Sequence, residues 1–252
     1  MLIDTHCHLD ACAGDCGEVY AEARRAGVKR LVVPAVTLAS FPAVRDCALR
    51  HAGCFAAYGL HPLYIGAARE SDLDELRHWL ASERPVAVGE IGLDHHVSGV
   101  DRRAQEFFFA EQLKLARDFG LPVIVHVRRA VDAALRQLRR IRVPGGIAHA
   151  FNGSRQQADE FLKLGFALGF GGAMTFAGST RIRQLAASLP EAAIVLETDA
   201  PDIPPAWLRG ASNTPGQLPR IAAELASLRG VPVAAAAAMT AANARRVLPG
   251  IA

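Results

Sequence analysis

Two histidines separated by one residue stand near the start of the chain, in the sequence Ile3-Asp4-Thr5-His6-Cys7-His8. The stretch 2–10 is predicted to form a strand, and side chains two apart on a strand point to the same side. His6 and His8 would therefore direct two imidazoles toward one point, as a strand does when it presents nitrogen ligands to a transition metal. Two half-buried structural histidines would share this spacing, so the pair alone leaves both roles open.

Histidine and carboxylate side chains also follow several other apolar stretches. Together with the first pair, these residues are His6, His8, His61, Glu90, His126, His149 and Asp199. Alternation along a strand puts such a residue on the side of the apolar residue two positions earlier, as with Ile124 and His126. The same rule places Glu90 on the side of Val88. Alternation therefore predicts that these side chains point the same way.

Any one of these residues could be a buried structural group with a hydrogen-bond partner. A group of buried imidazoles and carboxylates is different, because each uncompensated charge is costly to remove from water. A bound cation offsets that cost. Without His61, the four histidines and two carboxylates that are left still exceed what one tetrahedral zinc ion accepts. Their number predicts two divalent ions with a carboxylate between them.

These residues need a fold that brings strand ends together. Apolar stretches alternate with amphipathic helical ones, with predicted strands at 2–10, 29–34, 54–59, 86–90, 122–126, 146–149, 166–170 and 193–199. Predicted helices occupy 15–27, 40–52, 71–82, 101–119, 130–140, 154–164, 179–188, 217–229 and 233–247. This order predicts a single (β/α)8 TIM barrel, one domain over 1–252, with its site at the C-terminal ends of the strands. An open doubly wound sheet would need a glycine-rich loop after the first strand, where this chain has His-Cys-His.

The composition limits the classes of protein open to this chain. Hydrophobic residues make up 51% and charged residues 21%, which excludes a disordered or collagen-like chain. The net charge of +3 permits an anionic partner without requiring one. Five cysteines without a CxxC spacing indicate reduced thiols, and a strand close to Met1 leaves no room for a signal peptide. We therefore expect a cytoplasmic protein without a membrane span.

Six motifs, taken together and in this order, are specific to one family. They are Ile3-Asp4-Thr5-His6-Cys7-His8-Leu9-Asp10, Gly59-Leu60-His61-Pro62, Val88-Gly89-Glu90-Ile91-Gly92-Leu93-Asp94, His126-Val127-Arg128, His149-Ala150-Phe151-Asn152-Gly153-Ser154 and Leu196-Glu197-Thr198-Asp199-Ala200-Pro201. Over essentially its whole length the chain resembles the TatD-type metal-dependent deoxyribonucleases, a branch of the amidohydrolase superfamily. Where such proteins usually have aromatic residues after Gly-Leu-Asp, this chain has His95 and His96.

The resemblance implies a division of the ligands between two ions. One ion would be held by His6, His8, Glu90 and Asp199, and the second by Glu90, His126 and His149. Glu90 would then bridge two divalent ions of zinc, manganese or magnesium. We expect Glu197, Asp94 and Asp10 to support the ligands or cap the chain, and His95 and His96 to face solvent.

The residues around the predicted ions indicate a substrate. Arg128 follows His126 by two positions and suits a planar, bidentate grip on a phosphate, with Arg129, Arg155 and Arg209 as further cations of the rim. His61 would hold a phosphate oxygen or protonate the departing alkoxide, while Asp199 would take a proton from the attacking hydroxide shared by the ions. We therefore expect a nuclease that cleaves phosphodiester bonds from one end of single-stranded DNA, with RNA as a further substrate.

Two other functions stay open at this point. The same ions would serve hydrolysis of an ester, a lactone or a cyclic amide, including an aminoacyl ester, because metals do not specify a substrate. A barrel without catalytic activity could instead use metal as a structural staple, although structural sites are closed and this donor set leaves open positions.

Overall fold

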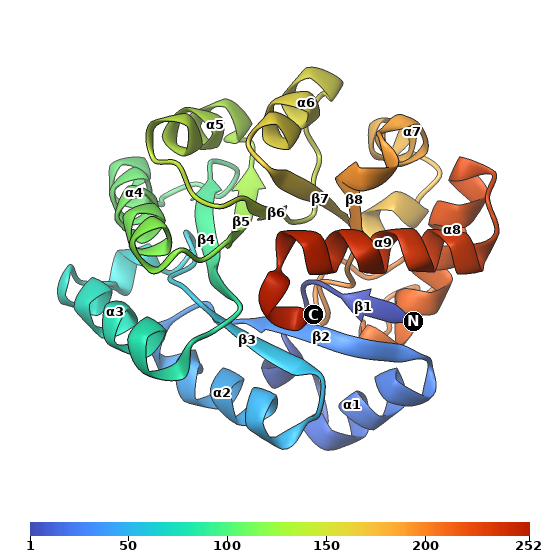
Figure 1. Cartoon of the computed structure of the whole chain (residues 1–252), viewed down its shortest axis with the longest axis horizontal. Helices are drawn as coiled ribbons and strands as arrows, with labels where there is room; N and C mark the ends of the chain where they lie inside the picture. Colours follow the sequence, from blue (N-terminus) through green and yellow to red (C-terminus); the bar gives the residue numbers. More distant parts are fainter.

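The predicted apolar stretches form eight parallel strands that lie side by side in chain order. The structure is a computed structural model that describes residues 1–252. The strands are β1 (Leu2–Asp4), β2 (Val28–Pro34), β3 (Cys54–Tyr58), β4 (Ala87–Asp94), β5 (Val123–Arg128), β6 (Gly146–Ala148), β7 (Phe166–Phe170) and β8 (Ile194–Leu196). Figure 1 shows the strands at the centre of the molecule with the helices around them. The predicted (β/α)8 TIM barrel is therefore confirmed.

Helices follow the strands close to the predicted positions. They are α1 (Cys16–Arg25), α2 (Phe41–Arg50), α3 (Ser71–Glu83), α4 (Arg102–Phe119), α5 (Val131–Arg140), α6 (Arg155–Lys163), α7 (Thr180–Ser188), α8 (Leu218–Arg229) and α9 (Val233–Val247). Side chains cap several first turns, since Asp15 accepts a hydrogen bond from the amide of Glu18 in α1, and Asp101 accepts one from Arg103 in α4. These caps fix where each helix begins after its loop.

The ring of strands closes between β8 and β1. The amide and the hydroxyl of Thr5 both donate to the carbonyl of Leu196, at 3.1 Å. The carboxylate of Asp4 accepts hydrogen bonds from the amide of Thr198 at 3.0 Å and from its hydroxyl at 2.6 Å. Asp4 is fully buried, and this burial raises its pKa to about 8. A polar side chain thus joins the first strand to the last directly beneath the site.

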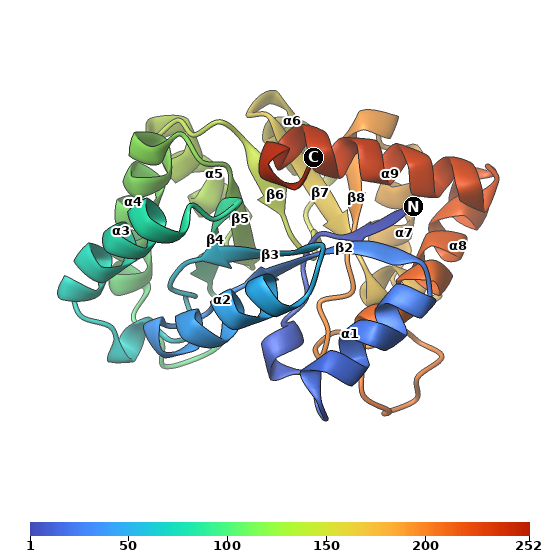
Figure 2. The same cartoon turned by 60° about the horizontal axis from the view of Figure 1, so that its bottom comes forward.

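The interior of the barrel is filled by one apolar layer. Each strand contributes one residue to it: Ile3, Val32, Ala57, Ala87, Ile124, Ile147, Ala167 and Val195. Helix α9 adds Ala241, Ala244 and Val247 to the same cluster, because its small side chains let it lie across the N-terminal ends of the strands. Figure 2 shows α9 at one end of the strands and the segments after β1 and β8 at the opposite end. Only that opposite end is open for a site.

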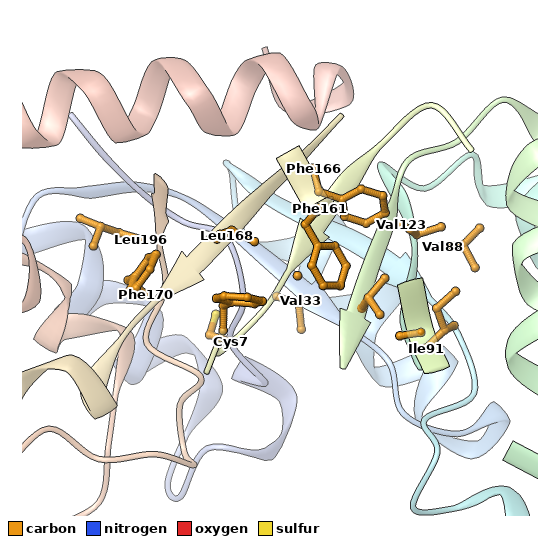
Figure 3. Close-up of a cluster of buried hydrophobic side chains, with 14 of the residues drawn as sticks. Cys7, Val33, Val88, Ile91, Val123, Phe161, Phe166, Leu168, Phe170 and Leu196 are labelled. Carbon is orange, nitrogen blue, oxygen red and sulfur yellow. The ribbon is translucent and has the colours of Figure 1, made fainter. Parts of the chain in front are cut away.

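A second, larger apolar layer lies between the strands and the surrounding helices. It contains 53 buried residues from the outward sides of the strands and the inward sides of the helices. Figure 3 shows part of it, where Phe161 of α6 lies beside Phe166 of β7 with ring centroids 5.5 Å apart. This layer makes the strands apolar on both faces, as the sequence indicates.

Two predicted strands that carry site residues are shorter than expected. β1 ends at Asp4 instead of residue 10, and β8 ends at Leu196 instead of residue 199. The chain after β1 still alternates, because the amide of Cys7 donates to Val32 in β2 and the amide of His8 donates to Ala200. His6 and His8 therefore point inward from an extended segment that no longer belongs to the regular ladder.

No single helix is long and apolar enough to cross a membrane. The segments Pro215–Arg229 and Val233–Val247 reach the required length and hydropathy only as a pair, and they are bent by 105° relative to each other.

Candidate metal centre

Glu90 occupies the centre of the open end of the barrel, and only 2% of its surface is exposed. Its Oε1 atom lies 2.9 Å from Nε2 of His149, 3.0 Å from Nδ1 of His126 and 3.4 Å from Nε2 of His61. These histidines come from three different strand ends. One oxygen of Glu90 therefore faces one set of imidazole nitrogens.

The other oxygen of Glu90 faces a second set. Its Oε2 atom lies 3.3 Å from Nε2 of His6 and 3.5 Å from Nε2 of His8. The Oδ1 atom of Asp199 lies 3.3 Å from the same nitrogen of His6 and 3.9 Å from that of His8. His6 and His149 stack with their ring centroids 4.0 Å apart, so the two sets adjoin. Glu90 stands between them with one oxygen on each side.

The position of Glu90 depends on an irregularity in β4 that alternation did not predict. Ala87 lies in the interior layer, whereas Val88 lies in the outer layer toward the helices. The prediction that Val88 and Glu90 share a side is therefore wrong. The register of β4 against β5 shifts between Val88 and Ile91, and this shift turns Glu90 inward to the site.

Backbone and carboxylate partners orient two of the histidines. Nδ1 of His8 lies 3.1 Å from the carbonyl oxygen of Pro34, so it carries the proton and leaves Nε2 free. Nε2 of His126 lies 3.0 Å from Oδ2 of Asp94, which leaves Nδ1 facing Glu90. The other oxygen of Asp94 accepts hydrogen bonds from the amides of His96 and Val97. Asp94 thus both caps its loop and holds a ring in place.

His61 differs from the other histidines in its protonation. The amide of Leu63 donates to its Nδ1 atom at 3.2 Å, so in the neutral ring Nε2 must carry the proton. That nitrogen points at Glu90 as a hydrogen-bond donor and has no free lone pair for a metal. Proximity alone would group His61 with Glu90 and His126 as possible ligands. Its hydrogen bonds instead favour a role as a donor to an oxygen atom.

Glu197 fills a space that exists because residue 169 is glycine. The carboxylate accepts a hydrogen bond from the amide of Ala150 at 2.5 Å and lies 3.7 Å from Nδ1 of His149. A Cβ atom on Gly169 would stand 2.2 Å from Oε2 of Glu197. Glu197 therefore lies beside His149, one of the predicted ligands, and the sequence alone does not show that glycine is needed opposite it.

The donor atoms fit divalent metal ions. Three overlapping groups place all their ligand atoms within 4.8 Å of one another: His6 with His149 and Asp199, His6 with His8 and Glu90, and His61 with Glu90 and His126. Imidazole nitrogen and carboxylate oxygen together suit borderline ions such as zinc and manganese. Nδ1 of His6 is buried without a hydrogen-bond partner, and burial holds the pKa of His6 well below its usual value, so this neutral ring can offer Nε2 to a cation.

The charges of the site predict how metal affinity depends on pH. Burial disfavours the cationic form of His8, but the hydrogen bond and charge of Glu90 outweigh it and raise the pKa of His8 to about 9. Burial raises the pKa of Asp199 to about 7. Both groups must lose a proton to bind metal, so we expect affinity to increase with pH up to about 9, by about tenfold per pH unit for each proton displaced.

Isothermal titration calorimetry in buffers of different ionisation enthalpy measures both this affinity and the protons released. Release of protons at pH 7 is the expected result. An affinity that is constant between pH 6 and 9, with no proton release, would contradict it.

The remaining predicted residues lie around this centre. Arg128 is exposed at the end of β5, and its guanidinium forms no ion pair with an acidic side chain. Arg155 does not serve as a free cation of the rim, because it pairs with Asp159 at 3.0 Å and donates to the carbonyl of Ser188. His96 is exposed and His95 is half-buried, and neither belongs to the groups of possible ligands.

One feature beside the centre was not predicted from the sequence. A cavity of about 150 Å³ lies between the segments that follow β2 and β3, lined by Leu38, Leu60, Tyr64 and neighbouring residues. The Tyr64 ring is 53% exposed, and its centroid lies 5.7 Å from that of His61. The sequence signal for this feature is Tyr64 itself, an aromatic residue three positions after His61 in Gly59-Leu60-His61-Pro62-Leu63-Tyr64.

A barrel of eight parallel strands with imidazoles and carboxylates at its open end defines a class of metal-dependent enzymes. Comparison with known proteins agrees: residues 3–249 match the model of the family described as TatD related DNase. The chain belongs to this family. It is 40% identical over 237 residues to the "Uncharacterized metal-dependent hydrolase YjjV" of Escherichia coli K12, covering 92% of this chain and 91% of that protein.

Three further likenesses extend the comparison. The chain is 36% identical over 239 residues to the "3'-5' ssDNA/RNA exonuclease TatD" of Klebsiella pneumoniae, covering 92% of this chain and 90% of that protein. The crystal structure of YjjV from Escherichia coli superposes with a TM-score of 0.95 at 37% identity, covering 98% of both chains. A TatD family hydrolase from Entamoeba histolytica shares the fold, with a TM-score of 0.85 at 18% identity.

Proposed function

We propose that this protein is a hydrolase that uses two divalent metal ions to cleave phosphodiester bonds at one end of a single-stranded nucleic acid. The observation that carries the proposal is Glu90, whose two oxygens each face a separate set of imidazole nitrogens. The resemblance to a named exonuclease supports the choice of a nucleic acid. His6, His8, Glu90 and Asp199 would hold one ion, and Glu90, His126 and His149 the other.

Asp199 and His61 have separate roles in the proposed reaction. Divalent ions, when bound, acidify a water molecule and neutralise the charge that develops on the phosphoryl oxygens. Asp199 accepts the proton of the attacking water, because its carboxylate lies 3.3 Å from Nε2 of His6, beside the predicted ions. His61 donates its Nε2 proton to a phosphate oxygen or to the departing alkoxide.

Two features outside the ligand set favour a nucleic acid. Arg128 presents an exposed guanidinium without an acidic partner, which suits a bidentate contact to phosphate. Tyr64 offers an exposed ring beside the cavity next to His61, and a base can stack on such a ring whatever its sequence. An uncharged lactone or cyclic amide would have no use for Arg128.

We also propose that the chain 1–252 acts as one hydrolase domain in the cytoplasm. All five cysteines are free thiols, which is the usual state of cysteine in that compartment.

The experiment that tests this function starts from protein stripped of metal with EDTA. Single-stranded DNA and RNA labelled at either end, a lactone and an aminoacyl ester are each incubated with zinc, manganese or magnesium. We expect stepwise shortening of the nucleic acid only after metal is restored. Hydrolysis of the lactone or ester without any shortening of DNA or RNA would support the alternative hydrolase. Metal binding with no hydrolysis would support a structural role.

The variant Arg128→Lys separates phosphate recognition from metal binding. Lysine keeps the positive charge but loses the planar fork, so we expect hydrolysis of phosphodiesters to decrease by about one to two orders of magnitude at unchanged metal content. That loss corresponds to roughly 1 to 3 kcal/mol for a charge-assisted hydrogen bond. Arg136→Lys, on the exposed face of α5, is a matched control. An equal loss on an uncharged ester would show that Arg128 supports the architecture of the site instead.

A further inference from the structure

A pair of thiols lies in contact away from the metal centre. Sγ of Cys16, the first residue of α1, is 3.4 Å from Sγ of Cys47 in α2, and neither is in a disulfide. The two residues are 31 positions apart in the sequence. Figure 1 shows α1 and α2 as neighbours on the outside of the barrel. A disulfide needs the two sulfur atoms at about 2.05 Å, so this pair must approach by about 1.4 Å to form one.

A histidine faces one thiol of this pair. Nε2 of His51 lies 3.6 Å from Sγ of Cys16. The ring stacks on Tyr20 with centroids 4.5 Å apart, and the Tyr20 hydroxyl donates to the carbonyl of Ala52 at 2.8 Å. The amide of His51 donates to the carbonyl of Cys47 at the end of α2. The imidazole is therefore held where it can accept the proton of Cys16.

The two thiols differ in their surroundings. Cys16 is half-buried and is the first residue of α1, where its thiol faces His51. Cys47 is only 6% exposed, and burial together with the neighbouring Cys16 raises its pKa well above the usual range. The thiol of Cys16 is thus accessible and next to a base, while the thiol of Cys47 is buried and stays protonated. A reactive thiol with a resolving thiol has this arrangement.

We propose that Cys16 and Cys47 form a peroxide-reactive pair, in which Cys16 reacts with a hydroperoxide and Cys47 resolves the product as a disulfide. His51 accepts the thiol proton, and the sulfur of Cys16 attacks one peroxide oxygen. The O–O bond breaks, and the departing oxygen takes the proton back from His51, which gives a sulfenic acid on Cys16 and releases water or an alcohol. The thiol of Cys47 then attacks the sulfenic sulfur and expels water. Two electrons pass from the two thiols to the hydroperoxide, and a small-molecule thiol restores the pair.

This pair is chemically separate from the hydrolase. None of its residues belongs to the six predicted metal ligands, so its oxidation can be followed without reference to catalysis. The disulfide would join α1 to α2 and close a loop of the chain, which stabilises the folded state. For a chain of this size we expect the Tm to rise by about 5 °C or more on oxidation.

The test uses the full-length, metal-loaded protein, reduced and then treated with one equivalent of hydrogen peroxide. Free thiols are alkylated at timed intervals, and the digested peptides are measured by mass spectrometry. We expect a linked pair of peptides containing Cys16 and Cys47, with the Cys16 thiol lost at least about tenfold faster than that of Cys12, which is also half-buried. Dithiothreitol should reverse the change.

Two variants make the result decisive. In Cys47→Ser the sulfenic acid on Cys16 should persist and be trapped by dimedone, while His51→Gln should slow the loss of Cys16 by about tenfold without preventing the disulfide. Equal rates for Cys12 and Cys16, or a sulfinic acid on Cys16 in the unmodified sequence without any disulfide, would overturn the proposal. So would protection of both thiols by bound metal that is lifted by a chelator, because the pair would then be a metal site.

Discussion

Replacing Glu90 by glutamine is expected to remove most of the bound metal and to lower phosphodiester hydrolysis by about three orders of magnitude or more. Glutamine has nearly the same shape, but its amide group has only one acceptor oxygen and no charge. The carboxylate of Glu90 lies within 3.5 Å of five imidazole nitrogens from both sets, whereas Asp199 comes this close to His6 alone. Its charge therefore cannot be replaced by a neighbour.

Metal content measured by elemental analysis, together with turnover of labelled DNA, checks this prediction. Glu75→Gln, at an exposed position of α3, is the matched control and should keep both metal and activity. Circular dichroism should show the same helix content for Glu90→Gln, because the strand contacts of β4 are unchanged. A variant that retains two ions per chain would show that Glu90 does not bridge them.

The sequence predicted the elements well where a single periodic pattern runs their full length. Helix α9 has the predicted bounds of 233 and 247, and β7 has those of 166 and 170. In α9 and β7, local propensity and burial favour the same structure, so contacts with distant residues do not shift the bounds of either element. The first strand was predicted too long because the hydrogen bonds of residues 5–8 leave the regular ladder and Leu9–Ala11 form a 3-10 helix, neither of which the sequence shows.

The sequence indicates which residues gather at the open end of the barrel, but it does not give their geometry. Histidines and carboxylates at strand ends are visible from the sequence, since a barrel brings all such ends together. The orientation of Glu90 is not, because the shift in β4 depends on its register with β5. The sequence also does not predict which nitrogen of His61 carries the proton, because the backbone amide of Leu63 determines this by donating to Nδ1. Hydrogen bonds of this kind depend on backbone angles that residue types do not specify.

Asp4 illustrates a further limit of the sequence. It precedes the two histidines and resembles one more candidate ligand. In the structure its carboxylate is fully buried and accepts hydrogen bonds from Thr198, so it joins β1 to β8. Residues 194 positions apart make this contact, which no local pattern predicts. Its role follows from the closure of the barrel and not from the chemistry of the open end.

Replacing Asp199 by asparagine is expected to lower turnover by about two to four orders of magnitude while much of the metal is retained. Asp199 approaches His6 at 3.3 Å, but the other histidines near it are 3.9 Å away, so its loss should weaken metal binding less than the loss of Glu90. The larger effect is on the proton, because an amide cannot accept it at any accessible pH. Asp202→Asn, at an exposed position of the same loop, is the matched control and should retain activity.

The pH dependence of turnover identifies the role of Asp199. In the unmodified sequence turnover should rise with pH on the acidic side, because a carboxylate must lose its own proton before it can accept one. Burial raises the pKa of Asp199 to about 7 in the metal-free protein, and bound cations would move the rise to lower pH. In Asp199→Asn this rise should disappear at saturating metal and DNA concentrations. If turnover is near normal, or if the same rise persists in the variant, another group accepts the proton and Asp199 serves only as a ligand.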